Sequence, residues 1–193
     1  MKKGPLDGVK VLDLSQVLSA PFCGMLLADM GAEVIKVERP GSGDISRAYG
    51  PYVNDISLYF CQYNRGKKGV AIDMSSESGK RVVMDLVAQV DIVIENFKSG
   101  TLEKLGLGYE EMVKVNPGLI YGSISGFGTY GPLSHLPCMD IIAASRSGLV
   151  AQSGVDVPVK PGFSLCDTWA GLQLMRGLTM GLLQKQQTNR SVR

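Results

Sequence analysis

Short apolar runs rich in β-branched residues alternate along this chain with longer stretches of helical periodicity. The apolar runs lie at residues 9–14, 34–38, 70–74, 91–95 and 119–124. The helical stretches lie at residues 22–30, at 75–87, and around residues 102 and 112. Short β-branched runs are typical of buried strands, and strands that alternate with helices form βαβ units. The pattern therefore predicts an α/β fold, with a Rossmann-like parallel sheet and helices on both faces.

Residues at the predicted helix ends support this division. Pro21 suits the first position of the first helix, and Gly31 suits the position just after its end. Ser75 or Ser76 is placed to cap the helix that follows the third run. The polar stretch at 40–55 is interpreted as a loop.

The pattern changes after Gly126. Residues 126–131 and 154–162 are predicted to be loops, with a helix at 140–150 between them. A long helix then runs from Asp167 to about Lys185, and the residues after it are polar. A domain rarely ends on such a trailing helix, so we expect the fold to be truncated after it.

Composition indicates a folded globular chain. Hydrophobic residues make up 45% of the 193 residues and charged residues 20%, which argues against disorder. The net charge of +2 is too small to indicate nucleic acid as the main partner. A local basic patch could still bind a small phosphorylated ligand.

The cysteine and histidine content gives no metal motif. The four cysteines include no CxxC pair, and His135 is the single histidine, so we expect no metal site. Isolated cysteines in apolar segments are typical of reduced thiols in the cytoplasm. The N-terminus lacks the apolar stretch of a signal peptide, and no run reaches the roughly 20 apolar residues of a membrane span. We therefore expect a cytoplasmic protein without a membrane partner.

Candidate binding residues follow the ends of the predicted strands, where open α/β sheets bind ligands. Ser15 to Ala20 follow the first strand and lead into a helix N-terminus that could face a phosphate. The residues after the second and fourth strands are Arg39, Asn96, Phe97, Lys98 and, a little later, Lys104. Three cations and an aromatic ring suit a nucleotide phosphate, although lysines in such positions are usually only solvated. Neither a GxGxxG turn after the first strand nor a GxxxxGKS/T loop is present, which disfavours an NAD-dependent dehydrogenase.

Asp167 is the candidate nucleophile. It follows an apolar run and precedes the long helix, so it suits a helix N-cap, whose side chain accepts backbone N–H bonds. A carboxylate at that point is also kept ionised and can attack a substrate that reaches it. Both interpretations stay open on the sequence. Asp140 has the same ambiguity and is interpreted as mainly structural, and His135 as a surface residue.

A collinear series of motifs runs through the chain. It opens with APFCGMLLADMGAEVIKVERPGSGD at residues 20–44. The motifs that follow are Asn64-Arg65-Gly66-Lys67-Lys68, Ile72-Asp73, Glu95-Asn96-Phe97, Leu105-Gly106-Leu107-Gly108-Tyr109, Asn116-Pro117, Ser125-Gly126-Phe127-Gly128 and Asp167-Thr168-Trp169-Ala170-Gly171. From about Leu6 to Gln187 the chain resembles the class III CoA-transferases. That group includes formyl-CoA and carnitine CoA-transferases and the related α-methylacyl-CoA racemases.

The resemblance implies a coenzyme A site and a catalytic aspartate. Asp167 matches the acyl-carrying carboxylate of the family. The positions that match its CoA contacts are Leu18, Ser19, Arg39, Ile72, Asn96, Phe97, Lys98 and Lys104. The implied enzyme moves CoA from an acyl-CoA donor to a carboxylic acid acceptor, through an acyl–aspartyl anhydride and an aspartyl-CoA thioester, without a metal.

The resemblance also implies what lies outside this chain. Family members carry a second, smaller domain and a C-terminal return segment, and they form interlocked homodimers. We therefore expect residues 1–193 to be the N-terminal CoA-binding portion of such an enzyme, which would be a homodimer at full length.

Two alternatives remain. A racemase typically has Gly-His-Asp where this chain has Cys138-Met139-Asp140, so one of its acid/base partners is missing. A non-catalytic CoA-binding or dimerisation module would leave the apolar face of the last helix exposed at Leu172, Met175 and Leu178.

Overall fold

The computed structural model describes residues 4–188. Its centre is a five-stranded sheet in the order β5-β2-β1-β6-β7, in which every neighbouring pair is parallel. The strands are β1 (Lys10–Asp13), β2 (Glu33–Glu38), β5 (Lys68–Ala71), β6 (Ile92–Glu95) and β7 (Ile120–Ser123). The predicted parallel sheet and its five strands are confirmed. Only β5 is clearly displaced, because Asp73 Oδ1 accepts the N–H of Ser75 at 3.0 Å in a turn that ends the strand early.

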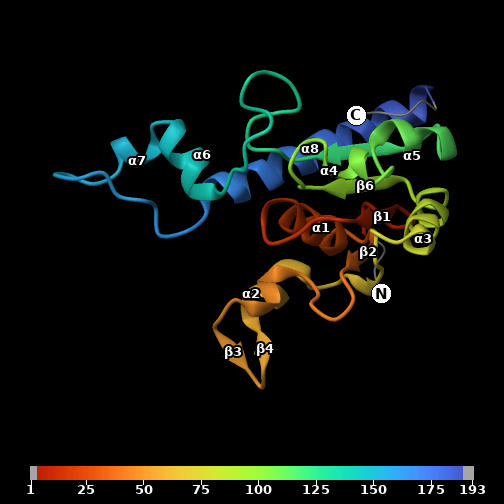
Figure 1. Cartoon of the computed structure of the whole chain (residues 1–193), viewed down its shortest axis with the longest axis horizontal. Helices are drawn as coiled ribbons and strands as arrows, with labels where there is room; N and C mark the ends of the chain where they lie inside the picture. Colours follow the sequence, from red (N-terminus) through yellow and green to blue (C-terminus); the bar gives the residue numbers. More distant parts are fainter. Residues whose placement is uncertain (1–3, 189–193) are drawn as a thin grey trace.

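Alternate residues of each strand pack on opposite faces of the sheet. Leu12 and Val93 enter a buried cluster with residues of α3, α4 and α5, whereas Val11 and Ile94 enter a second cluster with residues of α1 and α8. Each face of the sheet is therefore covered by helices, which confirms the prediction of helices on both faces (Figure 1). The bounds of these helices are α1 (Ser19–Asp29), α3 (Glu77–Val87), α4 (Thr101–Lys104), α5 (Tyr109–Val115) and α8 (Leu165–Thr188).

The first helix begins earlier than predicted. Because α1 starts at Ser19, Pro21 is its third residue and not its first. A proline is tolerated there because the first four N–H groups of a helix have no intrahelical partner. Gly31 adopts φ +99° just after the helix, as expected of a C-terminal stop. At α3, Ser76 is the capping serine, and its Oγ accepts the N–H of Gly79 at 3.0 Å.

The prediction of a plain loop at 40–55 is wrong. This region contains a short 3₁₀ helix, η1 (Ile45–Ala48), and β3 (Tyr52–Val53), which pairs in a hairpin with β4 (Ile56–Ser57) just after the region. The helix α2 (Leu58–Asn64) follows. Strands of two residues carry no readable alternation of apolar and polar positions, so these two could not be predicted from the sequence. The hairpin projects away from the sheet at the bottom of Figure 1.

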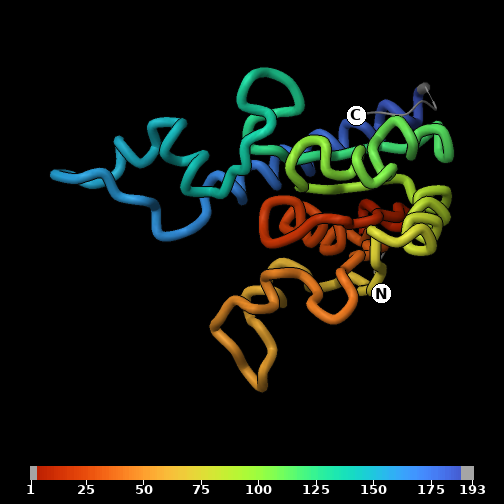
Figure 2. Tube along the Cα trace, viewed as in Figure 1, coloured from red at the N-terminus to blue at the C-terminus, as the bar shows by residue number. Residues whose placement is uncertain are grey.

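Residues 127–163 form an arm in which two short helices replace the single helix predicted at 140–150. These are α6 (Asp140–Arg146) and α7 (Leu149–Gln152), and Gly148 adopts φ +82° between them. The trace in Figure 2 runs outward from the sheet through this arm and returns at the start of α8. His135 is exposed in the loop before α6, as predicted.

The long C-terminal helix is present as α8, and it begins two residues before Asp167. Its apolar face is divided: Leu178 is 2% exposed on the sheet, whereas Leu172 is 43% exposed. The exposure expected of a dimerisation module is therefore found at Leu172 and not at Leu178, and Met175 is half-buried against the second cluster. Residues 189–193 of the predicted polar end lie outside the described residues. In the part of the chain that the structure describes, no helix combines the length and apolar content needed to cross a membrane.

Candidate functional site

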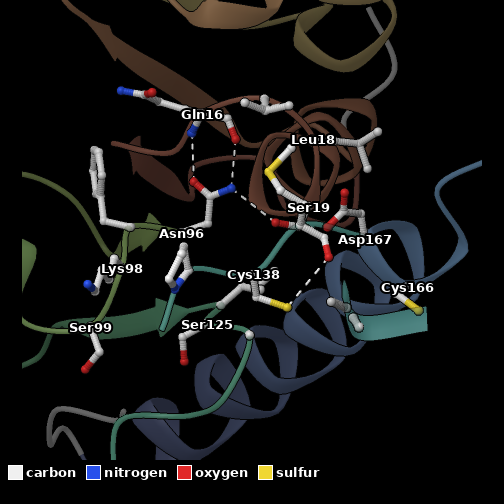
Figure 3. Close-up of a pocket in the computed structure, with 18 of the residues that line it drawn as sticks. Gln16, Leu18, Ser19, Asn96, Lys98, Ser99, Ser125, Cys138, Cys166 and Asp167 are labelled. Atoms are coloured by element: carbon white, nitrogen blue, oxygen red, sulfur yellow. Dashed lines mark hydrogen bonds between the residues drawn. The ribbon is translucent and has the colours of Figure 1, made fainter. Parts of the chain in front are cut away.

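A cavity of about 420 Å³ opens at the carboxyl ends of β1, β6 and β7 (Figure 3). Open parallel sheets bind their ligands at this edge. The lining comes from the three strand ends, the segment before α6 and the first turns of α8. It includes Gln16–Ser19, Asn96–Ser99, Ile124–Gly126, Leu136–Met139 and Cys166–Asp167.

The side chain of Asn96 ties the loop after β1 to the end of β6. Its Oδ1 accepts the N–H of Gln16 at 2.8 Å, and its Nδ2 donates to the Gln16 carbonyl at 2.7 Å and to Ser19 Oγ at 3.1 Å (Figure 3). Val17, which lies between Gln16 and Ser19 in this loop, adopts φ +66°, a conformation that β-branched residues rarely adopt. The amide of Asn96 therefore helps to hold a strained loop in the cavity wall.

A buried ion pair also holds this loop. Lys36 Nζ lies 2.9 Å from Asp44 Oδ2 and donates to the Ser15 carbonyl at 2.7 Å. Asp44 Oδ1 accepts the N–H of Val17 at 3.1 Å. Burial acts to raise the pKa of Asp44, but Lys36 and the bonds from Ser46 outweigh it and hold that pKa below its ordinary value.

A second buried ion pair joins the end of β1 to α1. Lys67 Nζ lies 2.7 Å from Asp13 Oδ2 and also donates to the Pro21 carbonyl at 2.9 Å. Burial disfavours the charge of Asp13, yet Lys67 and Lys36 hold its pKa below the ordinary value. Neither ion pair could be predicted from the sequence, because the partners lie on segments that only the fold brings together.

Glu95 supports the residues that follow β6. It is buried, its Oε2 accepts the N–H of Phe97 at 2.7 Å, and burial raises its pKa. This bond turns the chain at the strand end, so that Phe97 and Lys98 enter the cavity lining.

Asp167 lies in the first turn of α8 and lines the cavity. It does not cap the helix, so the N-cap interpretation of this residue is wrong. The cap is Asp140 at the start of α6, whose Oδ1 accepts the N–H groups of Cys166 and Asp167 at 2.9 and 3.2 Å. The mainly structural role expected of Asp140 agrees with these bonds, and the carboxyl of Asp167 is not used in capping.

The pKa of Asp167 is raised to about 6. Burial is the largest cause, the nearby charge of Asp140 adds to it, and Lys160 opposes both. Carboxyl groups that titrate this close to neutrality are concentrated at functional sites.

Comparison with known proteins identifies the family. The sequence profile of CoA-transferase family III matches residues 6–192. The chain belongs to this family. It is 45% identical over 191 residues to succinyl-CoA:glutarate CoA-transferase of Mus musculus, an alignment that covers 97% of this chain and 44% of that protein. It is 42% identical over 191 residues to acetyl-CoA:oxalate CoA-transferase of Acetobacter aceti, with 97% of this chain and 49% of that protein covered.

A solved structure shares the fold of this chain. A CAIB/BAIF family protein from Brucella suis superimposes with a TM-score of 0.94 and 38% identity, over 98% of this chain and 52% of that one. The chain therefore spans about half the length of the relatives that it matches.

Part of the set of residues predicted to contact CoA gathers at the cavity. Its lining includes Leu18, Ser19, Asn96, Phe97 and Lys98. Arg39 and Lys104 do not line it and are exposed, just past β2 and at the end of α4. Ile72 is buried in the core below the sheet edge, so its side chain is unavailable to a ligand and only its backbone could meet one.

Gln16 of the lining lies in the stretch Ser15–Ala20, where the sequence predicted ligand binding, whereas Ser125, Cys138 and Cys166 were not named as site residues. The one local signal was Gly126 in the glycine loop after β7: a Cβ there would collide with Cys138 Cβ. Only glycine lets the segment before α6 close on this loop. Among residues 4–188, no three or more His, Cys, Asp and Glu side chains are grouped so as to hold a metal ion.

Proposed function

We propose that this chain is the N-terminal CoA-binding portion of a class III CoA-transferase, which moves CoA from an acyl-CoA donor to a carboxylic acid acceptor. The observation that carries the proposal is that Asp167 shares one cavity with the loops that end β1 and β6. A carboxylate nucleophile beside a ligand-binding sheet edge is the arrangement that this reaction needs. Membership of family III and the names of the relatives support it.

CoA would lie along the sheet edge with its thioester at Asp167. Phe97 offers a ring on which an adenine can stack, and Lys98 beside it is an exposed cation. The N-terminus of α1, at Ser19 in the cavity wall, can face a phosphate group. Arg39 and Lys104 would meet phosphates further along this extended ligand.

The proposed chemistry is covalent. The carboxylate of Asp167 attacks the thioester carbonyl, which breaks the C–S bond and leaves an acyl–aspartyl anhydride and CoA thiolate. The thiolate then attacks the aspartyl carbonyl of the anhydride, which forms an aspartyl-CoA thioester and releases the donor acid as a carboxylate. The acceptor carboxylate reverses the two steps, so that a new acyl-CoA leaves and Asp167 is restored.

The environment of Asp167 suits this role. With a pKa of about 6, the carboxyl is ionised at neutral pH and yet more basic than an ordinary aspartate. Its place in the first turn of α8 favours the anion, because the N-terminal end of a helix dipole is positive.

The relatives guide the choice of substrates for a test. Their names give succinyl-CoA with glutarate, and acetyl-CoA with oxalate. We propose short dicarboxylic acids as the acceptor class for the full-length protein. We also propose a homodimer at full length, which the exposed apolar residues Phe163, Trp169 and Leu172 favour. The cytoplasmic location stays a prediction.

Isothermal titration with CoA tests the binding half of the proposal. We expect Phe97→Ala to weaken binding by about tenfold or more, because stacking on an aromatic ring contributes about 1–3 kcal/mol. Arg39→Ala should weaken it too, whereas Arg81→Ala, which removes an exposed arginine on α3, is the matched control and should have no effect. Equal affinities in all four proteins would contradict the proposed placement of CoA.

Mass spectrometry tests the chemical half. After a quenched reaction with succinyl-CoA, we expect an adduct on the peptide that contains Asp167, and none in Asp167→Asn. An adduct that survives in the variant would assign the chemistry to another residue.

A further inference from the structure

Asp140 joins three segments at the start of α8. The residue is 7% exposed, and its Oδ1 accepts the N–H groups of Cys166 and Asp167. Its Oδ2 lies 3.4 Å from Lys160 Nζ, on the loop that precedes α8. One buried side chain therefore connects α6, this loop and the first turn of the helix that carries Asp167.

This arrangement differs from an ordinary helix cap. A capping side chain usually belongs to the residue just before the helix. Here it comes from Asp140, 26 and 27 residues before the two N–H groups that it accepts. The position at which the backbone of Asp167 enters the cavity therefore depends on where α6 holds Asp140.

The cap also puts a second negative charge beside Asp167. Asn would accept the same two N–H bonds without that charge, so the bonds alone do not require an aspartate. Lys160 supplies a compensating positive charge on the other oxygen of Asp140. Asp140 and Lys160 therefore hold the first turn of α8 in place and also place two opposite charges near the carboxyl of Asp167.

We propose that Asp140 and Lys160 are positioning residues for Asp167: Asp140 fixes where its carboxylate enters the cavity, and the pair sets the electrostatic field in which that carboxylate reacts. The inference rests on the proposed function of Asp167 as the acyl-carrying group.

Among residues 4–188, the other titratable groups that interact with Asp167 are neutral near pH 7. They are Tyr59 and Tyr63 of α2, Cys138 before α6 and Cys166 of α8, and the pKa of each is raised, first by burial and in part by a nearby carboxylate. Asp140 and Lys160 are the charged groups that alter the pKa of Asp167, in opposite directions. Removing either charge should therefore move that pKa in a predictable direction.

A carboxyl titration tests the inference on the chain as it exists. The aspartates are labelled with ¹³C and the signal of Asp167 is assigned by its loss in Asp167→Asn. We expect its midpoint to fall by about one pH unit in Asp140→Asn, and to rise in Lys160→Gln. Asp156→Asn removes an exposed carboxylate elsewhere in the arm and should leave the midpoint unchanged.

A second variant separates position from charge. Asp140→Ala removes the two N–H bonds as well as the charge, so we expect acyl labelling of Asp167 to fall at least tenfold further than in Asp140→Asn. If the midpoint of Asp167 is unchanged in both Asp140→Asn and Lys160→Gln, the electrostatic part of the proposal is overturned. If Asp140→Ala and Asp140→Asn are labelled equally, the positional part is overturned. If no acyl-CoA labels Asp167 in the unmodified chain while the midpoints still shift, the proposed function has failed and the electrostatic pairing stands.

Discussion

Gly171 of α8 lies against the carbonyl oxygen of Ser19. A Cβ atom at Gly171 would come within 2.5 Å of that oxygen and 3.0 Å of Phe22 Cδ1. The missing side chain allows α8 to approach the start of α1, one helical turn after Asp167. This close approach brings the carboxyl of Asp167 to the same cavity as the loop after β1.

Gly171→Ala should therefore separate the two helices. The collision is with backbone, which cannot move aside as a flexible side chain can, and we expect a loss of about 1–3 kcal/mol in the free energy of unfolding. CoA binding, measured by isothermal titration, should weaken as well. Gly177→Ala is the control on the same helix: a Cβ there meets nothing within 4 Å, so this change should stabilise the chain by up to about 1 kcal/mol. Equal unfolding curves for the two variants would show that the close approach is not needed.

Asn96→Ala should loosen the cavity wall. The change leaves the N–H and carbonyl of Gln16 without their partner, at a cost of about 1–3 kcal/mol, and it frees the strained backbone at Val17. We expect weaker CoA binding together with lower stability in urea unfolding. Asn96→Asp keeps the acceptor for the Gln16 N–H and loses the two donated bonds, so its effect should be intermediate. CoA affinity that is unchanged in Asn96→Ala would contradict this role.

Lys67→Met should be strongly destabilising. It leaves the buried carboxylate of Asp13 without its partner, and breaking a buried pair in this way costs about 3–5 kcal/mol. Lys68→Met is the neighbouring control, since its pair with Glu33 is exposed and contributes at most about 1 kcal/mol. In urea unfolding we expect the double variant Asp13→Asn with Lys67→Met to recover part of the loss. Equal losses for Lys67→Met and Lys68→Met would rule out a structural role for the buried pair.

The raised pKa of Asp167 predicts a pH-dependent stability cost. The pKa is about 6 in the folded chain against an ordinary value of 3.8, so between these values the native state binds more protons than the unfolded state. Stability contributed by this group is therefore lost as pH rises from about 4 to about 6. At pH 8 the free energy of unfolding of Asp167→Asn should exceed that of the unmodified chain by on the order of 1 kcal/mol, after allowance for the solvent exposure of the carboxyl. Below pH 4 the two proteins should be equally stable. Thermal unfolding at a series of pH values measures this, and a gain that is the same at every pH would contradict the assignment.

The sequence by itself determined the sheet. The β-branched runs predicted five parallel strands, and the alternation of residues such as Val11 and Leu12 sent side chains to helices on both faces. The sequence also located Asn96, Phe97 and Lys98 at the end of a strand. These three residues line the cavity at that strand end, as expected. These features were readable because strand and helix periodicity is a local property of the chain.

The tertiary structure decided what surrounds Asp167. The hairpin of β3 and β4 is too short to leave a periodic signal, and the ion pairs of Lys36 and Lys67 join segments that are distant in the sequence. The cap of α8 is the clearest case, because the pattern around Asp167 suits a capping aspartate equally well. Only the fold could assign that role to Asp140, since a hydrogen bond between residues so far apart in the sequence depends on where the chain returns and not on any local preference.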